Sequence, residues 1–337
     1  MNRHSVKNMT INLDPHQHTL ERTVSCCGIG LHSGKPVNLT IRPAEEHSGI
    51  SFRRSDLGKK NAIPARMEQI VDTTLATTLG SGSERISTTE HLMAALHSAG
   101  IDNAEIELDG LEVPIMDGSA DPFVQLLSSG GKKKQRALRK VIRIIKPVSC
   151  ISGDKFIRIE PHNGFKITGS ISFGTELINE QSYTIDLSQE RFAREIAGAR
   201  TFGFVEQVEE LWRNGLALGC TLENVIAIHW NRRSVLNEEG LRFEDEFVRH
   251  KVLDLIGDLA LLGSPILGHV IASRSGHALH HSLMKAIADS PDCWEYVEFR
   301  KPGQPHVIAP AKPRKKRLSV SLPGMLFPAA APAPCPA

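Results

Sequence analysis

Alternating apolar and polar side chains predict short strands in both halves of the chain. Residues 37–42 alternate strictly, with apolar side chains at 37, 39 and 41, which is the period of a half-buried strand. The other segments that we expect to be strands are 104–108, 141–145, 156–159, 166–173 and 266–272. This spacing indicates a sheet in each half.

Helices are predicted between these strands. Ser87 is expected to open a helix that runs to about Ala99, and Asp121-Pro122 opens a second one. In the second half, helical patterns lie near 188–198, 245–262 and 278–289. Both halves therefore close in the order helix, strand, helix, which predicts two α+β domains of similar topology packed together.

Changes in composition suggest where the domains begin and end. The polar N-terminus and the Pro/Ala-rich, basic C-terminus lack a core-forming pattern, and a Gly/Lys-rich stretch separates the halves. The predicted order is a flexible N-terminus (1–15), a first domain (16–130), a linker (131–140), a second domain (141–300) and a disordered tail (301–337).

The overall composition is that of a globular protein. The 337 residues are 40% hydrophobic and 23% charged, and the net charge of +2 predicts no strong attraction to nucleic acid. Six cysteines without a CxxC pair, no secretory leader and no long apolar run predict a cytoplasmic protein without a transmembrane segment. We expect any contact with a protease or a membrane surface to be made by the tail.

The segment GIGLHSGK (28–35) is similar to phosphate-binding loops but lacks residues that those loops require. Ser33 stands where a dinucleotide fingerprint needs glycine, and Pro36 follows Lys35 where a triphosphate loop needs Ser or Thr. A tight turn is the better interpretation.

One helical pattern carries three ionisable residues on a single stripe. His250, Asp254 and Asp258 are four residues apart in RFEDEFVRHKVLDLIGDLALLG, and most other positions are apolar. A helix that is apolar on most sides is buried, and buried charges must be paired or bind a metal. His and Asp one turn apart can bind one cation, whereas the alternative is a solvated stripe on an amphipathic helix.

A second candidate pair is Glu90 and His91 in ISTTEHLMAAL. A metal ligand next to a carboxylate would place a base beside the metal. The alternative is structural, because Ser87-x-x-Glu90 is also a capping box. His97, in the same helix, is expected to be a surface or hydrogen-bonded histidine.

Two further segments carry weaker signals. His277 follows Gly276 at a strand-to-helix turn, where a side chain can project into a cleft, whereas His280 and His281 are expected to be packing or surface residues. GARTFGF (198–204) places a hydroxyl and two aromatic rings on a loop of the kind that often binds substrates.

Taken together, these segments resemble the UDP-3-O-acyl-N-acetylglucosamine deacetylase family, zinc hydrolases that perform the committed step of lipid A biosynthesis. The matching runs are GIGLHSG (28–34), ISTTEHLMAAL (86–96), GIDNAEIEL (100–108), VPIMDGSADPF (113–123), GARTFGF, VLNEEGLRFEDEFVRHKVLDLIGDL (235–259) and SGHAL (275–279). The resemblance covers residues from about 20 to 300.

The resemblance implies a fold and a catalytic site. The helices would be sandwiched between two β-sheets in ribosomal S5 domain 2-like halves, with a βαβ insert near 204–234 in the second. Zinc would be held by His91, His250 and Asp254, with Glu90 as the general base. His277 would be the general acid or the electrostatic partner of the oxyanion, with Asp258 as its carboxylate neighbour.

The resemblance also implies residues that bind the substrate, UDP-3-O-acyl-N-acetylglucosamine. Thr201 would donate to the oxyanion, Lys251 and Lys155 would lie near the nucleotide phosphates, and Phe173 would stack on uracil. The insert would form an apolar passage for the acyl chain. The residues assigned to this passage and its approach are Phe202, Phe204, Leu211, Ala217 and Leu218.

The sequence departs from the family at HALHH, where an asparagine pair is usual, and at GTELINEQ after Phe173, where many members have an Asn/Asp-His-Pro run. Two alternatives stay open at this point. One is a non-catalytic binding protein on the same scaffold, and the other is a zinc amidase acting on a different acylated sugar.

Overall fold

The computed structural model describes residues 13–58, 62–301 and 304–308. Its first half contains a five-stranded sheet in the order β2 (Val24–Ile29), β3 (Pro36–Pro43), β9 (Ala104–Leu108), β4 (Ile50–Arg54) and β5 (Ile63–Pro64). A smaller sheet joins β6 (Ile70–Asp72), β7 (Thr78–Ser81) and β8 (Glu84–Ile86). The helices of this half are α1 (Glu90–Ala99) and α2 (Asp121–Gly130), with short 3-10 turns at Ser55–Leu57 and Met67–Gln69.

The second half is built on an eight-stranded sheet. Its main path is β12 (Val148–Ser152), β13 (Lys155–Glu160), β18 (Ile266–Ser273), β11 (Val141–Ile144), β19 (Trp294–Lys301) and β20 (Gln304–Ile308). Strand β14 (Phe165–Ile171) also pairs with β18, and β15 (Gln181–Asp186) pairs with β14. The helices are α3 (Gln189–Glu195), α5 (Glu246–Ala260) and α6 (His277–Asp289).

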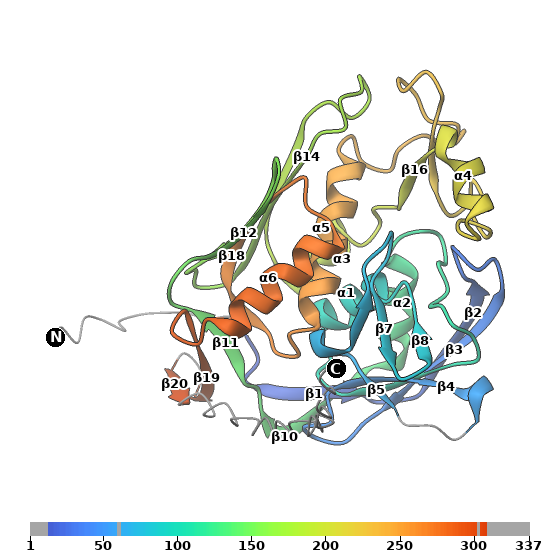
Figure 1. Ribbon diagram of the computed structural model, residues 1–337. Coiled ribbons are helices and arrows are strands. Elements are labelled where there is room, and N and C mark those ends of the chain that lie inside the picture. Colours follow the sequence, from blue (N-terminus) through green and yellow to red (C-terminus); the bar gives the residue numbers. More distant parts are fainter. Residues whose placement is uncertain (1–12, 59–61, 302–303, 309–337) are drawn as a thin grey trace, which may run out of the picture.

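The helices form a layer between the two sheets (Figure 1). Helix α2 packs on β2 of the first sheet, α5 and α6 pack on β14 and β12 of the second, and α1 packs against α5 in the middle. The predicted α+β fold class is therefore confirmed. A continuous apolar core extends through both halves and includes Leu92, Leu96, Leu253 and Ile256 of the central helices.

The predicted βαβ insert is present in the second half. Strands β16 (Phe202–Phe204) and β17 (Ile226–Ile228) pair in parallel, and α4 (Val208–Arg213) lies between them in the chain after a 3-10 turn at Val205–Gln207. A parallel pair needs a crossover connection, and the segment with α4 provides it. The two strands form a sheet of their own, separate from the eight-stranded sheet.

Two segments differ from the expected irregular structure. Residues 132–138 of the predicted linker form β10 (Lys132–Leu138), which pairs with β1 (His16–Leu20). The predicted tail from 301 is wrong at its start, because β20 pairs with β19 and places Val307 opposite Val297. The β-branched pair Val307-Ile308 favours that strand. The rest of the tail lies outside the described residues, and the domain boundaries stay a prediction.

The described cysteines, Cys26, Cys27, Cys150, Cys220 and Cys293, form no disulfide. In the part of the chain that the structure describes, no helix combines the length and apolarity needed to cross a membrane.

The backbones of α1 and α5 come very close together at Gly257 of α5. A Cβ atom at this position would lie 1.9 Å from the carbonyl oxygen of Glu90, which is the first residue of α1. Only glycine allows this spacing, because any side chain would overlap the α1 backbone. The sequence at 257 therefore determines how closely the two central helices pack.

We predict that Gly257→Ala destabilises the protein by about 1–3 kcal/mol, the usual cost of overpacking. Helix propensity alone would instead make Gly257→Ala more stable, by about 1 kcal/mol. Gly203→Ala is the control, because a Cβ at Gly203 would meet no atom within 4 Å. Urea unfolding of both variants measures the difference, and a stabilised Gly257→Ala protein would show that the helices are not held at this point.

Candidate active site and metal centre

Three buried side chains from the two central helices converge on one point. His91 comes from the first turn of α1, and His250 and Asp254 come from consecutive turns of α5. The Nε2 atoms of His91 and His250 lie 3.5 and 3.4 Å from Oδ1 of Asp254. The two imidazole rings meet edge to face, with centroids 5.0 Å apart. Because all three residues are buried, the alternative of a solvated stripe on α5 is wrong.

The spacing of these atoms fits a metal ion. Tetrahedral ligands about 2.0–2.1 Å from an ion are separated from one another by about 3.3 Å, which is longer than a normal hydrogen bond. The Nδ1–H of His250 donates to the carbonyl of Ala199 at 3.1 Å, so the lone pair on Nε2 faces the gap. Burial lowers the pKa of His250 to about 3, which keeps the ring neutral as a ligand must be.

The third candidate ligand is charged. Burial alone would raise the pKa of Asp254, but the charge of Lys251 opposes it, and that pKa is held well below its usual value. Lys251 donates from Nζ to Oδ2 of Asp254 at 2.9 Å, which leaves Oδ1 for the two histidines. Lys251 also lies over the ring of Phe202, 5.5 Å from its centroid. The structure thus places Lys251 beside the candidate metal centre.

Glu90 lies next to His91 and is almost completely buried. Burial raises the pKa of Glu90, and Oε2 accepts the backbone N–H of Thr77 at 3.1 Å. The capping-box alternative is wrong, because the Ser87 backbone N–H donates to Leu111 and the Ser87 hydroxyl accepts from Thr78. Glu90 is therefore a buried carboxylate at the cluster.

His277, the first residue of α6, forms an ion pair with Asp258. Its Nδ1 donates to Oδ2 of Asp258 at 2.7 Å, and its Nε2 lies 3.8 Å from Oε1 of Glu90. Burial alone would lower the pKa of His277, but Asp258 and Glu90 raise it to about 10. Burial likewise opposes ionisation of Asp258, yet His277 and His280 lower the pKa of this carboxyl. The pair is therefore an imidazolium beside a carboxylate.

Two residues of this network were missed from the sequence. The hydroxyl of Thr77 donates to Oδ1 of Asp258 at 2.5 Å, so Thr77 binds both Asp258 and Glu90. Nothing in TTLATTLG distinguishes Thr77 beforehand. His280 is fully buried, in agreement with the packing alternative, and it also donates from Nδ1 to Asp258 at 2.7 Å, a contact that the sequence did not predict. Its spacing of three residues from His277 on a helix was the available signal.

Asp258, His277 and His280 form a second group of potential metal donors in the part of the chain that the structure describes. Both histidines lie within hydrogen-bond distance of the same carboxylate oxygen. At 2.7 Å, each Nδ1 atom donates a proton to this oxygen, so we interpret the group as a hydrogen-bond network. The His91–His250–Asp254 group has longer spacings and is the better metal site.

A row of aromatic rings leads outward from the first group. Phe202 contacts His250, with ring centroids 6.2 Å apart, and Phe173 contacts both Phe202 and Phe204 at 5.6 and 5.9 Å. Phe173 is 42% exposed, so it can contact a ligand from solvent. Thr201 begins this loop, and its backbone N–H donates to the carbonyl of Gly118 at 2.8 Å.

The other predicted substrate residues belong to the insert and to the β12–β13 hairpin. Leu211 is half-buried, Ala217 is buried with a positive φ of 57°, and Leu218 is 52% exposed. Lys155 is exposed on the β12–β13 hairpin, and no contact found for it in the described part of the chain involves a site residue. Its assignment stays a prediction with no structural support.

The turn at 28–35 holds the insert against the first half. The backbone N–H groups of His32 and Ser33 both donate to the buried carboxylate of Glu112 at 2.9 Å. The carbonyls of Leu31 and His32 accept the N–H groups of Gly219 and Leu218. The amides that a phosphate loop would offer are occupied by Glu112, in agreement with a structural turn.

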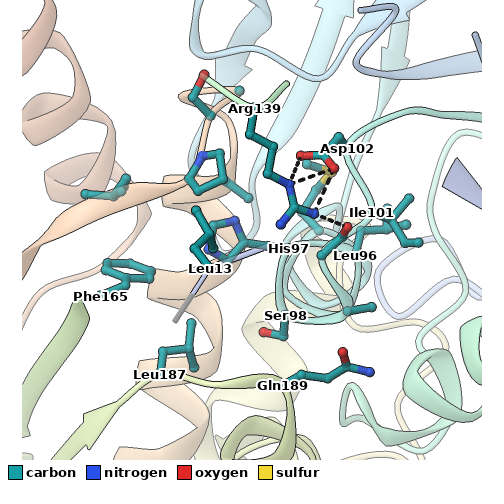
Figure 2. A pocket seen from close by; sticks show the side chains of 18 of the residues that line it. Leu13, Leu96, His97, Ser98, Ile101, Asp102, Arg139, Phe165, Leu187 and Gln189 are labelled. Atoms are coloured by element: carbon teal, nitrogen blue, oxygen red, sulfur yellow. Dashed lines mark hydrogen bonds and ion pairs between the residues drawn. The ribbon is translucent and has the colours of Figure 1, made fainter. Parts of the chain in front are cut away.

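A cavity of about 470 Å³ surrounds the C-terminal end of α1 (Figure 2). His97 and Phe165 meet edge to face there, at 5.6 Å between centroids, and Arg139 is paired with Asp102. Burial lowers the pKa of His97 to about 4, so the ring is neutral. The residues around this cavity include none of the candidate metal donors.

A buried group of two histidines and one aspartate, next to a carboxylate and a charged histidine, matches the residue set of metal-dependent hydrolases. Residues 17–289 match the family model of UDP-3-O-acyl N-acetylglycosamine deacetylase. The chain belongs to this family.

Curated relatives carry the same name. A UDP-3-O-acyl-N-acetylglucosamine deacetylase of Myxococcus xanthus is 50% identical over 286 residues, 85% of this chain and 90% of the relative. One from Acidithiobacillus ferrooxidans is 48% identical over 87% of this chain and 96% of its own length. One from Geobacter sp. is 47% identical over 84% and 92%.

We predict that His91→Ala, His250→Ala and Asp254→Ala each give a folded protein with little bound metal, since three protein ligands leave no spare donor. His97→Ala is the matched control, because it changes a histidine at the other end of α1. Metal content is measured by plasma emission after dialysis, and folding by circular dichroism. A full complement of metal in any of the three variants would remove that residue from the ligand set.

Proposed function

We propose that the chain is a zinc-dependent deacetylase that hydrolyses the N-acetyl group of UDP-3-O-acyl-N-acetylglucosamine. The products are acetate and UDP-3-O-acyl-glucosamine, and the reaction is the committed step of lipid A biosynthesis. The observation that carries the proposal is the convergence of His91, His250 and Asp254 beside Glu90. The printed names of the relatives supply the substrate.

Zinc is the metal that these donors favour. Two imidazoles and one carboxylate at tetrahedral spacing suit Zn²⁺ and leave a fourth position open. When bound there, zinc would polarise the attacking water and the amide carbonyl.

The protein's own groups supply the proton transfers. Glu90 takes a proton from the attacking water, and its buried position makes it a stronger base than an exposed glutamate. His277, charged and facing Glu90, stabilises the oxyanion and then gives a proton to the leaving amine. We assign the hydroxyl of Thr201 to the oxyanion as well, and Asp258 keeps His277 charged.

Recognition of the nucleotide and the acyl chain is also part of the proposal. The exposed ring of Phe173 is available to stack on uracil, and Lys251 is partly exposed beside the candidate metal. The apolar insert (204–234) would take the acyl chain, since each methylene hidden from water contributes about 0.8 kcal/mol. A cytoplasmic location and contacts of the C-terminal tail remain predictions from the sequence.

The direct test is to incubate the purified protein with UDP-3-O-acyl-N-acetylglucosamine, with and without a chelator. Acetate should form in equal amount to the free amine, stop with the chelator and return when zinc is added. Turnover that a chelator leaves intact would contradict a metal-dependent reaction.

Glu90→Gln should keep the fold and the zinc but lose roughly 10²–10⁴ in kcat, since the amide cannot accept the proton. Glu105→Gln, at an exposed position of β9, is the control and should match the wild type. Rates are measured at saturating substrate on zinc-loaded proteins. A near-normal kcat in Glu90→Gln would assign the base to another group.

Leu218→Trp should shift preference toward shorter acyl chains, because the larger ring narrows the proposed passage. Ala217 is less suited to this test, since its buried position and positive φ would add strain. Ile151→Trp, at a position 77% exposed on β12, is the control. The measurement is kcat/KM across an acyl-length series. An equal fall for every chain length would mean that Leu218 is structural.

A further inference from the structure

Asp258 is held by three donors, one from the loop at Thr77 and two from the first turn of α6. Thr77 donates to Oδ1, whereas Nδ1 of His277 and Nδ1 of His280 both donate to Oδ2 at 2.7 Å. A carboxylate has about four acceptor positions, so these donors fix its plane and leave it little freedom to rotate. The orientation of Asp258 in turn sets that of His277.

The protonation of His280 follows from its surroundings. The side chain is 1% exposed, and burial lowers its pKa, so the ring is neutral. Its single N–H is on Nδ1, because a carboxylate can only accept. Nε2 must then accept the hydroxyl of Ser275, which lies 2.9 Å away. Asp258 thus selects the tautomer of His280, and the Ser275 hydroxyl completes the hydrogen bonding of its other ring nitrogen.

We propose that His280 is a positioning residue for the reaction: it holds Oδ2 of Asp258 so that His277 keeps its Nε2–H directed toward Glu90 and the substrate. This inference rests on the proposed function. His280 makes no contact with the candidate metal donors in the described structure, so it acts through Asp258 and His277. His280 also has an electrostatic effect: its N–H partly neutralises the negative charge on Oδ2 of Asp258, the oxygen that binds His277.

The charged and titratable groups around His277 are Glu90 from α1, Asp254 and Asp258 from α5, and His280 from α6. Of these, His280 is the only one whose replacement leaves every carboxylate and the whole His91–His250–Asp254 group in place. Removing its N–H should strengthen the bond from His277 to Asp258. The imidazolium of His277 then persists to higher pH, and the basic limb of the pH–rate profile moves upward.

The experiment compares zinc-loaded wild type, His280→Leu and His280→Asn with UDP-3-O-acyl-N-acetylglucosamine, using His281→Leu as the matched control on the next residue. We expect His280→Leu to lose roughly 10- to 100-fold in kcat with KM little changed, the range seen when an orienting partner is removed. Its basic limb should move upward. His280→Asn, which keeps an N–H donor, should recover most of the rate.

Ser275→Ala provides a second route if His280→Leu fails to fold. It keeps the His280 side chain but removes the hydroxyl that donates to Nε2 of His280, and should lose roughly 3- to 10-fold in kcat, the equivalent of one neutral hydrogen bond. An unchanged kcat and pH profile in folded, zinc-loaded His280→Leu would overturn the proposal. A loss shared by His281→Leu, or not recovered by His280→Asn, would overturn it in favour of a packing role. Inactivity of the wild type would instead refute the proposed function.

Discussion

The close packing of α1 on α5 at Gly257 is the contact on which the site depends. The backbone of α5 reaches the carbonyl of Glu90 there, at the residue that begins α1 and directly precedes His91. His250 and Asp254 lie within two turns of Gly257 on the same helix. The candidate metal donors thus come from both halves of the chain, and they meet only when the two central helices lie this close.

The same contact buries an unusual concentration of charge. Four ionisable side chains are almost fully buried there: Glu90, Asp254, Asp258 and His277. An unpaired ion in such a place would cost several kcal/mol. Each has a partner: Lys251 binds Asp254, His277 binds Asp258, and the backbone of Thr77 donates to Glu90. Burial raises the pKa of Glu90, whereas the partners of Asp254 and Asp258 outweigh burial and lower the pKa values of those two carboxyls. One carboxylate becomes a base while the others stay ionised, which is the division of roles that acid–base catalysis requires.

Much of this arrangement was predictable from the sequence because it follows helical periodicity. The stripe of His250, Asp254 and Asp258 on an apolar helix indicated buried charge, and the family resemblance brought His91 and His277 to it. Thr77 could not be found in this way, since its role depends on a loop that meets two helices only in the folded chain. The capping box predicted at Ser87 does not form, because the backbone N–H and the hydroxyl of Ser87 make tertiary hydrogen bonds to Leu111 and Thr78. Strand β20 was missed because Pro and basic residues around it outweighed its short β-branched pair.

Anomalous diffraction at the zinc edge from crystals of the zinc-loaded protein tests the central claim most directly, because the described chain offers two groups of potential donors. A metal at the helix crossing should give one strong peak within bonding distance of Nε2 of His91, Nε2 of His250 and Oδ1 of Asp254. A peak between Asp258, His277 and His280 instead, with none at the first group, would contradict the account.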